Sequence, residues 1–169
     1  MAKGEAELLA FLAELGIPVR TVTHEPLFTV AQSQALRGQI PGGHTKNLFL
    51  KDKKDNYFLL TVEEEAEVDL KQIHKVIGAA SRVSFGKAEA MEALLGVSPG
   101  AVTAFGVIND DKGAVRIYID ESLLGHPVVN CHPLVNTATT SIAPGDLLRF
   151  IEATGHRPHI LNLAEQIAK

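Results

Sequence analysis

Gly42-Gly43-His44-Thr45-Lys46-Asn47-Leu48-Phe49-Leu50 tells more about the fold than any other stretch of this 169-residue chain. Two glycines loosen the approach and four polar residues follow. Three apolar residues then predict a strand, residues 44–51, that enters a buried core. A second apolar run at 57–62 follows the charged connection Asp52-Lys53-Lys54-Asp55-Asn56. Such a connection is typical of a turn, so the two runs predict a β-hairpin.

Lys46 lies at the start of this predicted strand, which gives it two possible roles. A lysine fixed beside a buried strand can present a positive charge to a phosphate or to a polarised carbonyl. Alternatively, its stem covers apolar surface while its amine reaches water. The segment alone leaves both interpretations open.

The rest of the chain mixes helical and extended patterns without a regular βαβ rhythm. Helices are expected at 4–15, 29–36, 70–77, 87–95 and 147–153, with Asp69 and Asp146 as N-caps and Gly78 and Gly96 as C-caps. Strands are expected at 19–23, 83–85, 101–108 and 114–119, the last two as a second hairpin; 127–134 and 135–142 are expected to be extended, and 159–163 to be a strand or a tail helix. These patterns predict one α/β (α+β-like) domain over 1–169, a mixed, mainly antiparallel sheet with packed helices.

Composition narrows the class of protein. Hydrophobic residues make up 46% of the chain and charged residues 21%, which suits a folded domain with its own core. The formal net charge of −4 argues against a DNA-coating protein, but it permits a local basic patch that grips the end of an RNA. Cys131 is the sole cysteine, no apolar stretch approaches the length of a membrane span and no signal-peptide pattern is present, so we expect a cytoplasmic protein.

Two further segments hold polar groups that suit a binding site. Gly96-Val97-Ser98-Pro99-Gly100 follows a predicted helix. Its backbone N–H groups can hold a carbonyl or phosphate oxygen. Alternatively, the segment only ends the helix and forms a tight turn. Asn130-Cys131-His132-Pro133-Leu134-Val135-Asn136 places a cysteine beside a histidine. Adjacent strand residues face opposite ways, which disfavours a Cys131 nucleophile with His132 as its base. His132 either donates to a substrate oxygen or is structural.

Other catalytic patterns are missing from the sequence. The histidine pairs His126/His132 and His156/His159 have neither an H-E-x-x-H helix nor a Cys-x-x-Cys element beside them, so we expect no metal and no cofactor. No serine lies in a G-x-S-x-G elbow, and no pair of carboxylates stands out.

Taken together, three segments resemble a known family. Gly43-His44-Thr45-Lys46-Asn47-Leu48-Phe49-Leu50, Gly96-Val97-Ser98-Pro99-Gly100-Ala101-Val102-Thr103-Ala104-Phe105-Gly106 and His132-Pro133-Leu134-Val135-Asn136 occur in the order found in free-standing prolyl-tRNA editing proteins of the YbaK/ProX type. The resemblance covers residues 19–162. It implies a hydrolase that removes a wrong amino acid from tRNA(Pro). The chain most resembles the alanine-removing branch of the family, with the cysteine-removing branch as the alternative. A non-catalytic module that binds aminoacyl-tRNA or an amino acid remains another possibility.

The resemblance also suggests roles for particular residues. Lys46 is the expected catalytic residue, binding a phosphate or ribose oxygen of the terminal adenosine. Backbone groups of Gly96, Ser98, Pro99 and Gly100 are expected to hold the aminoacyl carbonyl or amino end. Thr45, Asn47 and His132 are expected to bind the ribose and the attacking water. The expected partners are mischarged tRNA(Pro) and prolyl-tRNA synthetase.

Overall fold

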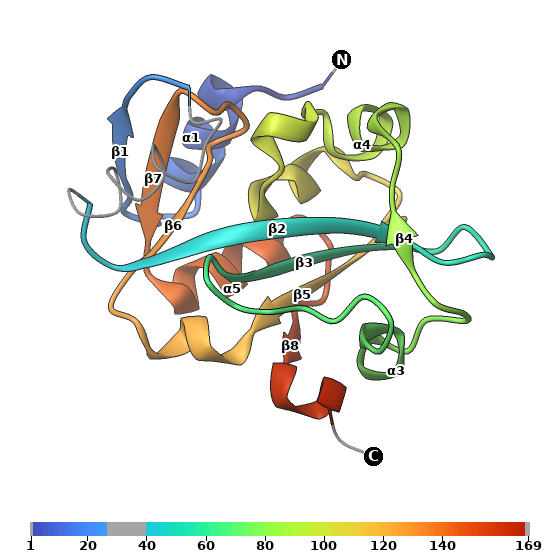
Figure 1. The fold of residues 1–169 in the computed structure, drawn as a ribbon. Coiled ribbons are helices and arrows are strands. Elements are labelled where there is room, and N and C mark those ends of the chain that lie inside the picture. The colour runs from blue at the N-terminus through green and yellow to red at the C-terminus, as the bar shows by residue number, and fades with distance from the viewer. Residues whose placement is uncertain (1, 27–39, 168–169) are drawn as a thin grey trace.

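The computed structural model describes residues 2–26 and 40–167, and a mixed sheet runs through them (Figure 1). Its strands are β1 (Arg20–Thr23), β2 (Gly43–Lys51), β3 (Tyr57–Glu63), β4 (Ser84–Phe85), β5 (Val115–Asp120), β6 (Val129–Cys131), β7 (Ala138–Ile142) and β8 (His159–Leu161). They lie in the order β1-β7-β6-β2-β3-β5-β8, with β4 also paired to β2. The predicted mixed α/β architecture is confirmed.

The helices have the following bounds: α1 (Glu5–Glu14), α3 (Ile73–Ile77), α4 (Ala88–Leu95), α5 (Pro144–Ala153), and the 3-10 helices η1 (Pro99–Ala101), η2 (Ala104–Asn109), η3 (Glu121–Gly125) and η4 (Leu163–Ile167). Gly78 and Gly96 end α3 and α4 in the left-handed conformation, as predicted. The helix expected at 29–36 lies outside the described residues.

The long strand β2 joins the two halves of the sheet (Figure 1). Its first residues, Gly43 and His44, pair in parallel with β6, and its last two pair with β4. Along most of its length it pairs antiparallel with β3, as the hairpin prediction required. Residues 45–49 therefore have a paired strand on one side only within the described chain.

The second predicted hairpin is wrong. Residues 104–109 form the 3-10 helix η2, and β5 pairs in parallel with β3. Phe105 and the other residues of 104–108 are all buried, and a run buried on every side has no periodicity that separates helix from strand. The Thr103 side chain accepts a hydrogen bond from Phe105 N and starts the helical turn.

Two predicted N-caps are also wrong. Helix α5 begins at Pro144 with Ala143 as its N-cap, because proline is favoured at the first helical position. Asp146 lies within the first turn and pairs with Arg149. Asp69 accepts a hydrogen bond from Lys71 N in a turn that precedes α3. The two segments expected to be extended over 127–142 shorten to β6 and β7.

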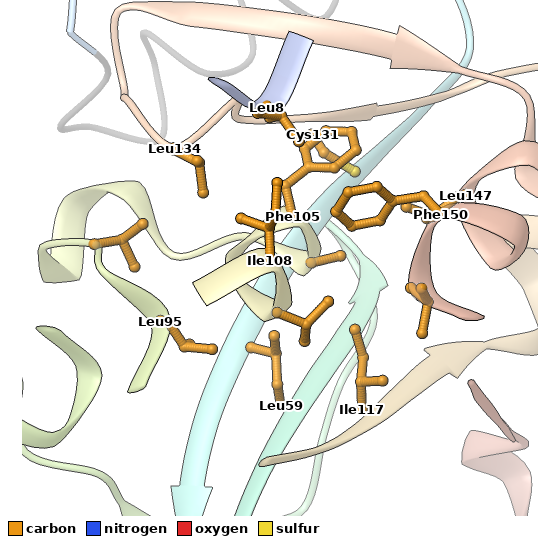
Figure 2. Close-up of a cluster of buried hydrophobic side chains, with 14 of the residues drawn as sticks. Leu8, Leu59, Leu95, Phe105, Ile108, Ile117, Cys131, Leu134, Leu147 and Phe150 are labelled. Atoms are coloured by element: carbon orange, nitrogen blue, oxygen red, sulfur yellow. The ribbon is translucent and has the colours of Figure 1, made fainter. Parts of the chain in front are cut away.

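Apolar side chains pack on both faces of the β2–β3 hairpin. On one face, Phe49 and Leu59 join a large cluster that includes Phe105 and Phe150, seen in Figure 2. On the other face, residues such as Leu50 and Leu60 pack with α3. We call these the α5 face and the α3 face. Because strand residues alternate, Thr45 and Asn47 belong to the α5 face and Lys46 to the α3 face.

Candidate functional site

Lys46 is held by the protein rather than extended into water. Its half-buried side chain reaches the turn after β3, where Nζ donates a short hydrogen bond to the carbonyl oxygen of Ala66. That turn is fixed by two backbone bonds, from Ala66 N to Glu63 O (2.9 Å) and from Glu64 N to His44 O (2.8 Å). A lysine ammonium has three N–H donors, so donors remain for a ligand oxygen.

Thr45 and Asn47 project from the opposite face of the same strand. Thr45 Oγ1 donates to Asn130 O at 2.7 Å, which ties β2 to β6. Asn47 Oδ1 accepts from Thr61 Oγ1 at 2.6 Å. Among the described residues, the side-chain nitrogen of Asn47 donates no hydrogen bond, so this amide can serve a ligand. The structure thus brings Thr45 and Asn47 together and points Lys46 away from them.

The open edge of β2 is where these two faces meet. Beyond His44 strand β6 leaves β2, and β4 joins only at Leu50. A ligand that lies along this edge can therefore meet Lys46 on one side of the strand and Asn47 on the other.

His132 follows β6 directly, and its hydrogen bonding defines what it can offer. Nδ1 lies 3.1 Å from Ala138 O, and because a carbonyl only accepts, Nδ1 carries the hydrogen. Burial lowers the pKa of His132; the bond to Ala138 opposes this shift, and the charge of His24 adds to it. The ring is therefore neutral near pH 7, and Nε2 carries a lone pair that accepts a hydrogen bond or a proton.

His24 is a neighbour of His132 that no sequence pattern indicates. The two ring centroids lie 6.5 Å apart. His24 Nδ1 donates to Glu25 O at 2.7 Å, and Nε2 lies 2.8 Å from Thr139 Oγ1. Residues 108 positions apart meet because β1 pairs with β7, a long-range contact without a local sequence signal.

The Gly96–Gly100 segment reaches the His132 loop through its last residues. A Cβ on Gly100 would lie 3.4 Å from Asn136 Nδ2, so the two loops touch. Gly96 instead ends α4, and a Cβ there would lie 2.5 Å from Asn109 Nδ2. Pro99 has no N–H group, which leaves Ser98 and Gly100 as backbone donors at the exposed turn.

The loop after His132 contains a strained residue. Leu134 has a φ of 71°, a value that favours glycine, and its side chain is buried against the large cluster (Figure 2). Strained backbone of this kind persists where the surrounding packing enforces it and is concentrated at functional sites. The packing of Leu134 therefore holds the loop between His132 and Asn136 in this conformation.

Cys131 faces away from His132, as the alternation of strand residues predicts. It is 2% exposed and packs in the large cluster with Leu8 and Phe105 (Figure 2). Burial raises the pKa of the Cys131 thiol to about 12, with the Thr45 hydroxyl acting weakly against this shift. The thiol is therefore protonated and poorly suited to act as a nucleophile.

The described residues contain neither a metal-binding cluster nor a membrane-spanning helix. No three histidine, cysteine, aspartate or glutamate side chains gather there as a group that could hold a metal ion. No helix in the described part of the chain is long and apolar enough to cross a membrane.

The far end of β2 carries a basic surface, which we call the basic tip: the half-buried Lys51 and the exposed Lys53, Lys54 and Arg82. Two hydrogen bonds hold residues 80–82 against the hairpin turn, from Lys53 N to Ser81 Oγ (2.9 Å) and from Ala80 N to Asp52 Oδ2 (2.9 Å). Phe85 on β4 is 58% exposed beside this surface. Five residues separate Lys46 from Lys51, about 17 Å along a strand.

Comparison with known proteins shows the family. The model of the aminoacyl-tRNA editing domain matches residues 24–150. The chain belongs to the aminoacyl-tRNA editing domain family. The matched part of this editing domain includes His24, Lys46, the Gly96–Gly100 segment and His132.

Relatives extend the similarity over most of the chain. Prolyl-tRNA synthetase associated domain-containing protein 1 of Mus musculus is 39% identical over 93% of this chain and 95% of the relative. Prolyl-tRNA editing protein ProX of Acetoanaerobium sticklandii is 31% identical over 88% of this chain and 91% of the relative. A solved structure described as a candidate trans-editing enzyme for prolyl-tRNA synthetase has a TM-score of 0.70 at 21% identity, covering 96% of this chain and 99% of its own, and supports the fold.

Proposed function

We propose that this protein is a trans-editing deacylase that hydrolyses the ester of mischarged tRNA(Pro), with Ala-tRNA(Pro) as its main substrate. The observation that carries the proposal is the ammonium of Lys46, held beside the open edge of β2 in a chain of the aminoacyl-tRNA editing family. The name of its ProX relative supports prolyl-tRNA as the substrate class.

The physical need for such an enzyme follows from the size of alanine. A pocket built for proline cannot strongly reject a smaller apolar residue, because each missing methylene changes binding by only about 1–3 kcal/mol. A second site that admits alanine and excludes proline by size corrects the error. Cysteine is larger than alanine by one sulfur atom but lacks the ring of proline, and Cys-tRNA(Pro) is the alternative substrate.

In the proposed mechanism, each donor has a separate target. Lys46 binds a phosphate or ribose oxygen of the terminal adenosine with its remaining N–H groups. The backbone N–H groups of Ser98 and Gly100 hold the ester carbonyl and stabilise the negative charge that develops on its oxygen. Thr45 and Asn47, on the other side of β2, hold the aminoacyl portion and the ribose.

His132 Nε2 acts as the acceptor for the attacking water or for the free ribose hydroxyl that orients it. Water adds to the carbonyl carbon, the bond to the ribose oxygen breaks, and that oxygen takes up the proton. The products are the free amino acid and tRNA. An aminoacyl ester is already activated, so the proposal requires no covalent intermediate and no metal; a chelator is expected to leave the deacylation rate unchanged.

The basic tip supplies a contact for the rest of the tRNA. Its lysines on the β2–β3 hairpin lie about 17 Å or more along the chain from Lys46, a distance suited to the stem that follows a short single-stranded end. The proposed partners are thus tRNA(Pro) and, as the names of several relatives suggest, prolyl-tRNA synthetase. Both belong to translation, so we place the reaction in the cytoplasm.

A deacylation panel tests the function directly. Alanyl, cysteinyl, seryl and prolyl esters of tRNA(Pro) are incubated with the protein, and each rate is compared with spontaneous hydrolysis. Fastest loss of the alanyl ester with the prolyl ester spared is the expected result. Fastest loss of the cysteinyl ester would select the alternative substrate. Binding of the tRNA without turnover of any ester would replace the enzyme by a binding module.

A further inference from the structure

The proposed mechanism leaves one polar group of the substrate without a partner. The α-amino group of an aminoacyl ester carries positive charge when protonated. The backbone N–H groups of Ser98 and Gly100 cannot hold it, because they are donors themselves. Lys46 repels it. An ammonium requires an acceptor, and an ionised carboxylate makes the strongest hydrogen bond with it.

Glu63 is the only carboxylate in β2, which carries Lys46, Thr45 and Asn47, and its partner strand β3. It lies directly opposite Thr45 in the β2–β3 pairing, on the α5 face. Side chains opposite each other in an antiparallel pair have Cβ atoms about 4.5–5.5 Å apart. Glu63 therefore extends the polar row formed by Thr45, Asn47 and Thr61.

The position of Glu63 is fixed from several sides. Its backbone nitrogen donates to Asp120 Oδ2 at 3.2 Å, and its Oε1 makes a short bond with His126 Nε2. His126 in turn packs against Gly43, where a Cβ would lie 2.5 Å from the ring. The Glu63 side chain remains 34% exposed, and its Oε2 has no partner among the described residues, so one carboxylate oxygen is open to a ligand.

Asp120 cannot take this role in place of Glu63. It is 4% exposed, and its two carboxylate oxygens already accept from Glu63 N and Ser122 N. Cys131 on the same face is a protonated thiol, and Asn47 Oδ1 is occupied by Thr61. Among these acceptors, Glu63 alone combines a negative charge with a free oxygen.

We propose that Glu63 binds the α-ammonium group of the aminoacyl ester and makes this protein selective for esters with a free amino group. His126 is a positioning residue that holds the carboxylate beside Thr45. The inference rests on the proposed deacylase function. The site would then recognise the α-ammonium group of the substrate in addition to the size of its side chain.

The test compares two esters of tRNA(Pro) that differ at one atom. The alanyl ester carries the amine, and the lactyl ester carries a hydroxyl in its place. Each enzymatic rate is divided by the spontaneous hydrolysis rate of the same ester. For the unchanged protein we expect kcat/KM to favour the alanyl ester by about tenfold or more, as expected for a hydrogen bond between charged groups.

Glu63→Gln is expected to remove this preference. Hydrolysis of the alanyl ester falls about tenfold or more, while the lactyl ester changes by less than about threefold. Glu121→Gln, an exposed acid at the same end of the sheet, is the matched control and retains the preference. Glu63→Asp keeps the charge and is expected to retain part of the preference.

Two outcomes overturn the inference while leaving the deacylase intact. One is an unchanged protein that hydrolyses both esters equally well, a result that needs no variant to fold. The other is an equal loss for both esters in a folded Glu63→Gln. If the unchanged protein hydrolyses neither ester above background, the proposed function and this inference are both overturned.

Discussion

The Lys46 side chain has a single described partner, the carbonyl oxygen of Ala66. We therefore expect its removal to lower the deacylation rate more than the stability of the fold. We expect Lys46→Ala to lower kcat/KM for Ala-tRNA(Pro) about tenfold or more, because hydrogen bonds to charged groups contribute about 1.5–3 kcal/mol. Deacylation at equal folded fraction measures the effect. Lys75→Ala, an exposed lysine on α3, is the control. Activity of Lys46→Ala within about threefold of the parent would refute the assigned role.

His132 gives the reaction a predicted pH dependence. Its pKa is lowered from the usual value near 6.5, so the ring is neutral above that range and Nε2 is free to accept. As pH falls through this lowered pKa, Nε2 becomes protonated and kcat/KM for the alanyl ester decreases. The measurement is a profile from pH 5 to 8 on folded protein. A rate that rises toward acid pH, or the same acid limb in His132→Gln, would contradict the role.

Cys131 is expected to matter for packing alone. Its thiol is buried with a pKa of about 12, so little thiolate forms at neutral pH. Cys131→Ala should keep the deacylation rate within about twofold while lowering the free energy of unfolding by about 1 kcal/mol through the small void it leaves. Abolished activity in a folded variant would restore a catalytic thiol.

At the scale of elements, the turn between β2 and β3 depends on the carboxylate of Asp52. Burial alone would raise its pKa, but hydrogen bonds from the Asn56 side chain and from the backbone of Ala80, Asn56 and Lys54 lower it to about 2. The ionised form therefore stabilises the fold above the ordinary pKa of 3.8, and this contribution is lost as pH falls toward 2.

Asp52→Asn tests this linkage by urea unfolding. At pH 7 the variant should be less stable than the parent, and the difference should shrink between pH 4 and pH 2. Asp55→Asn is the control, because Asp55 is exposed and its ion pair with Lys51 (3.2 Å) contributes little. A difference between parent and Asp52→Asn that stays constant down to pH 2 would show that the charge is unimportant.

The elements also explain what the sequence could and could not predict. The β2–β3 hairpin was predictable because its apolar runs and its charged turn are local signals. The parallel pairing of β3 with β5 was not, because more than fifty residues separate the partners. The grouping of Lys46, Gly100 and His132 in one site was predicted from family resemblance and stays a prediction. His24 and Glu63 became candidates only once the strand pairing was known.

For the whole molecule, the formal net charge of −4 conceals an uneven distribution. We expect the basic tip to carry much of the affinity for tRNA. Replacing Lys53 and Lys54 by glutamate should weaken tRNA(Pro) binding and reduce the slope of log K against log salt by roughly 1–2, since about one counterion is released for each phosphate contact. Titrations at several salt concentrations measure this slope. The same change at Lys71 and Lys75 is the control, and an equal effect there would deny the tip a special role.

The pairing of β1 with β7 has a consequence for how the protein is made. Arg20 pairs with Ser141, so about 120 residues must be added after β1 before its partner exists. At about 5–20 residues per second, that delay on the ribosome is on the order of ten seconds. During this time β1 has no strand beside it. A ribosome that pauses before β7 therefore leaves the N-terminal part of the nascent chain exposed to chaperones and proteases, and translation speed in this interval will influence how much protein survives.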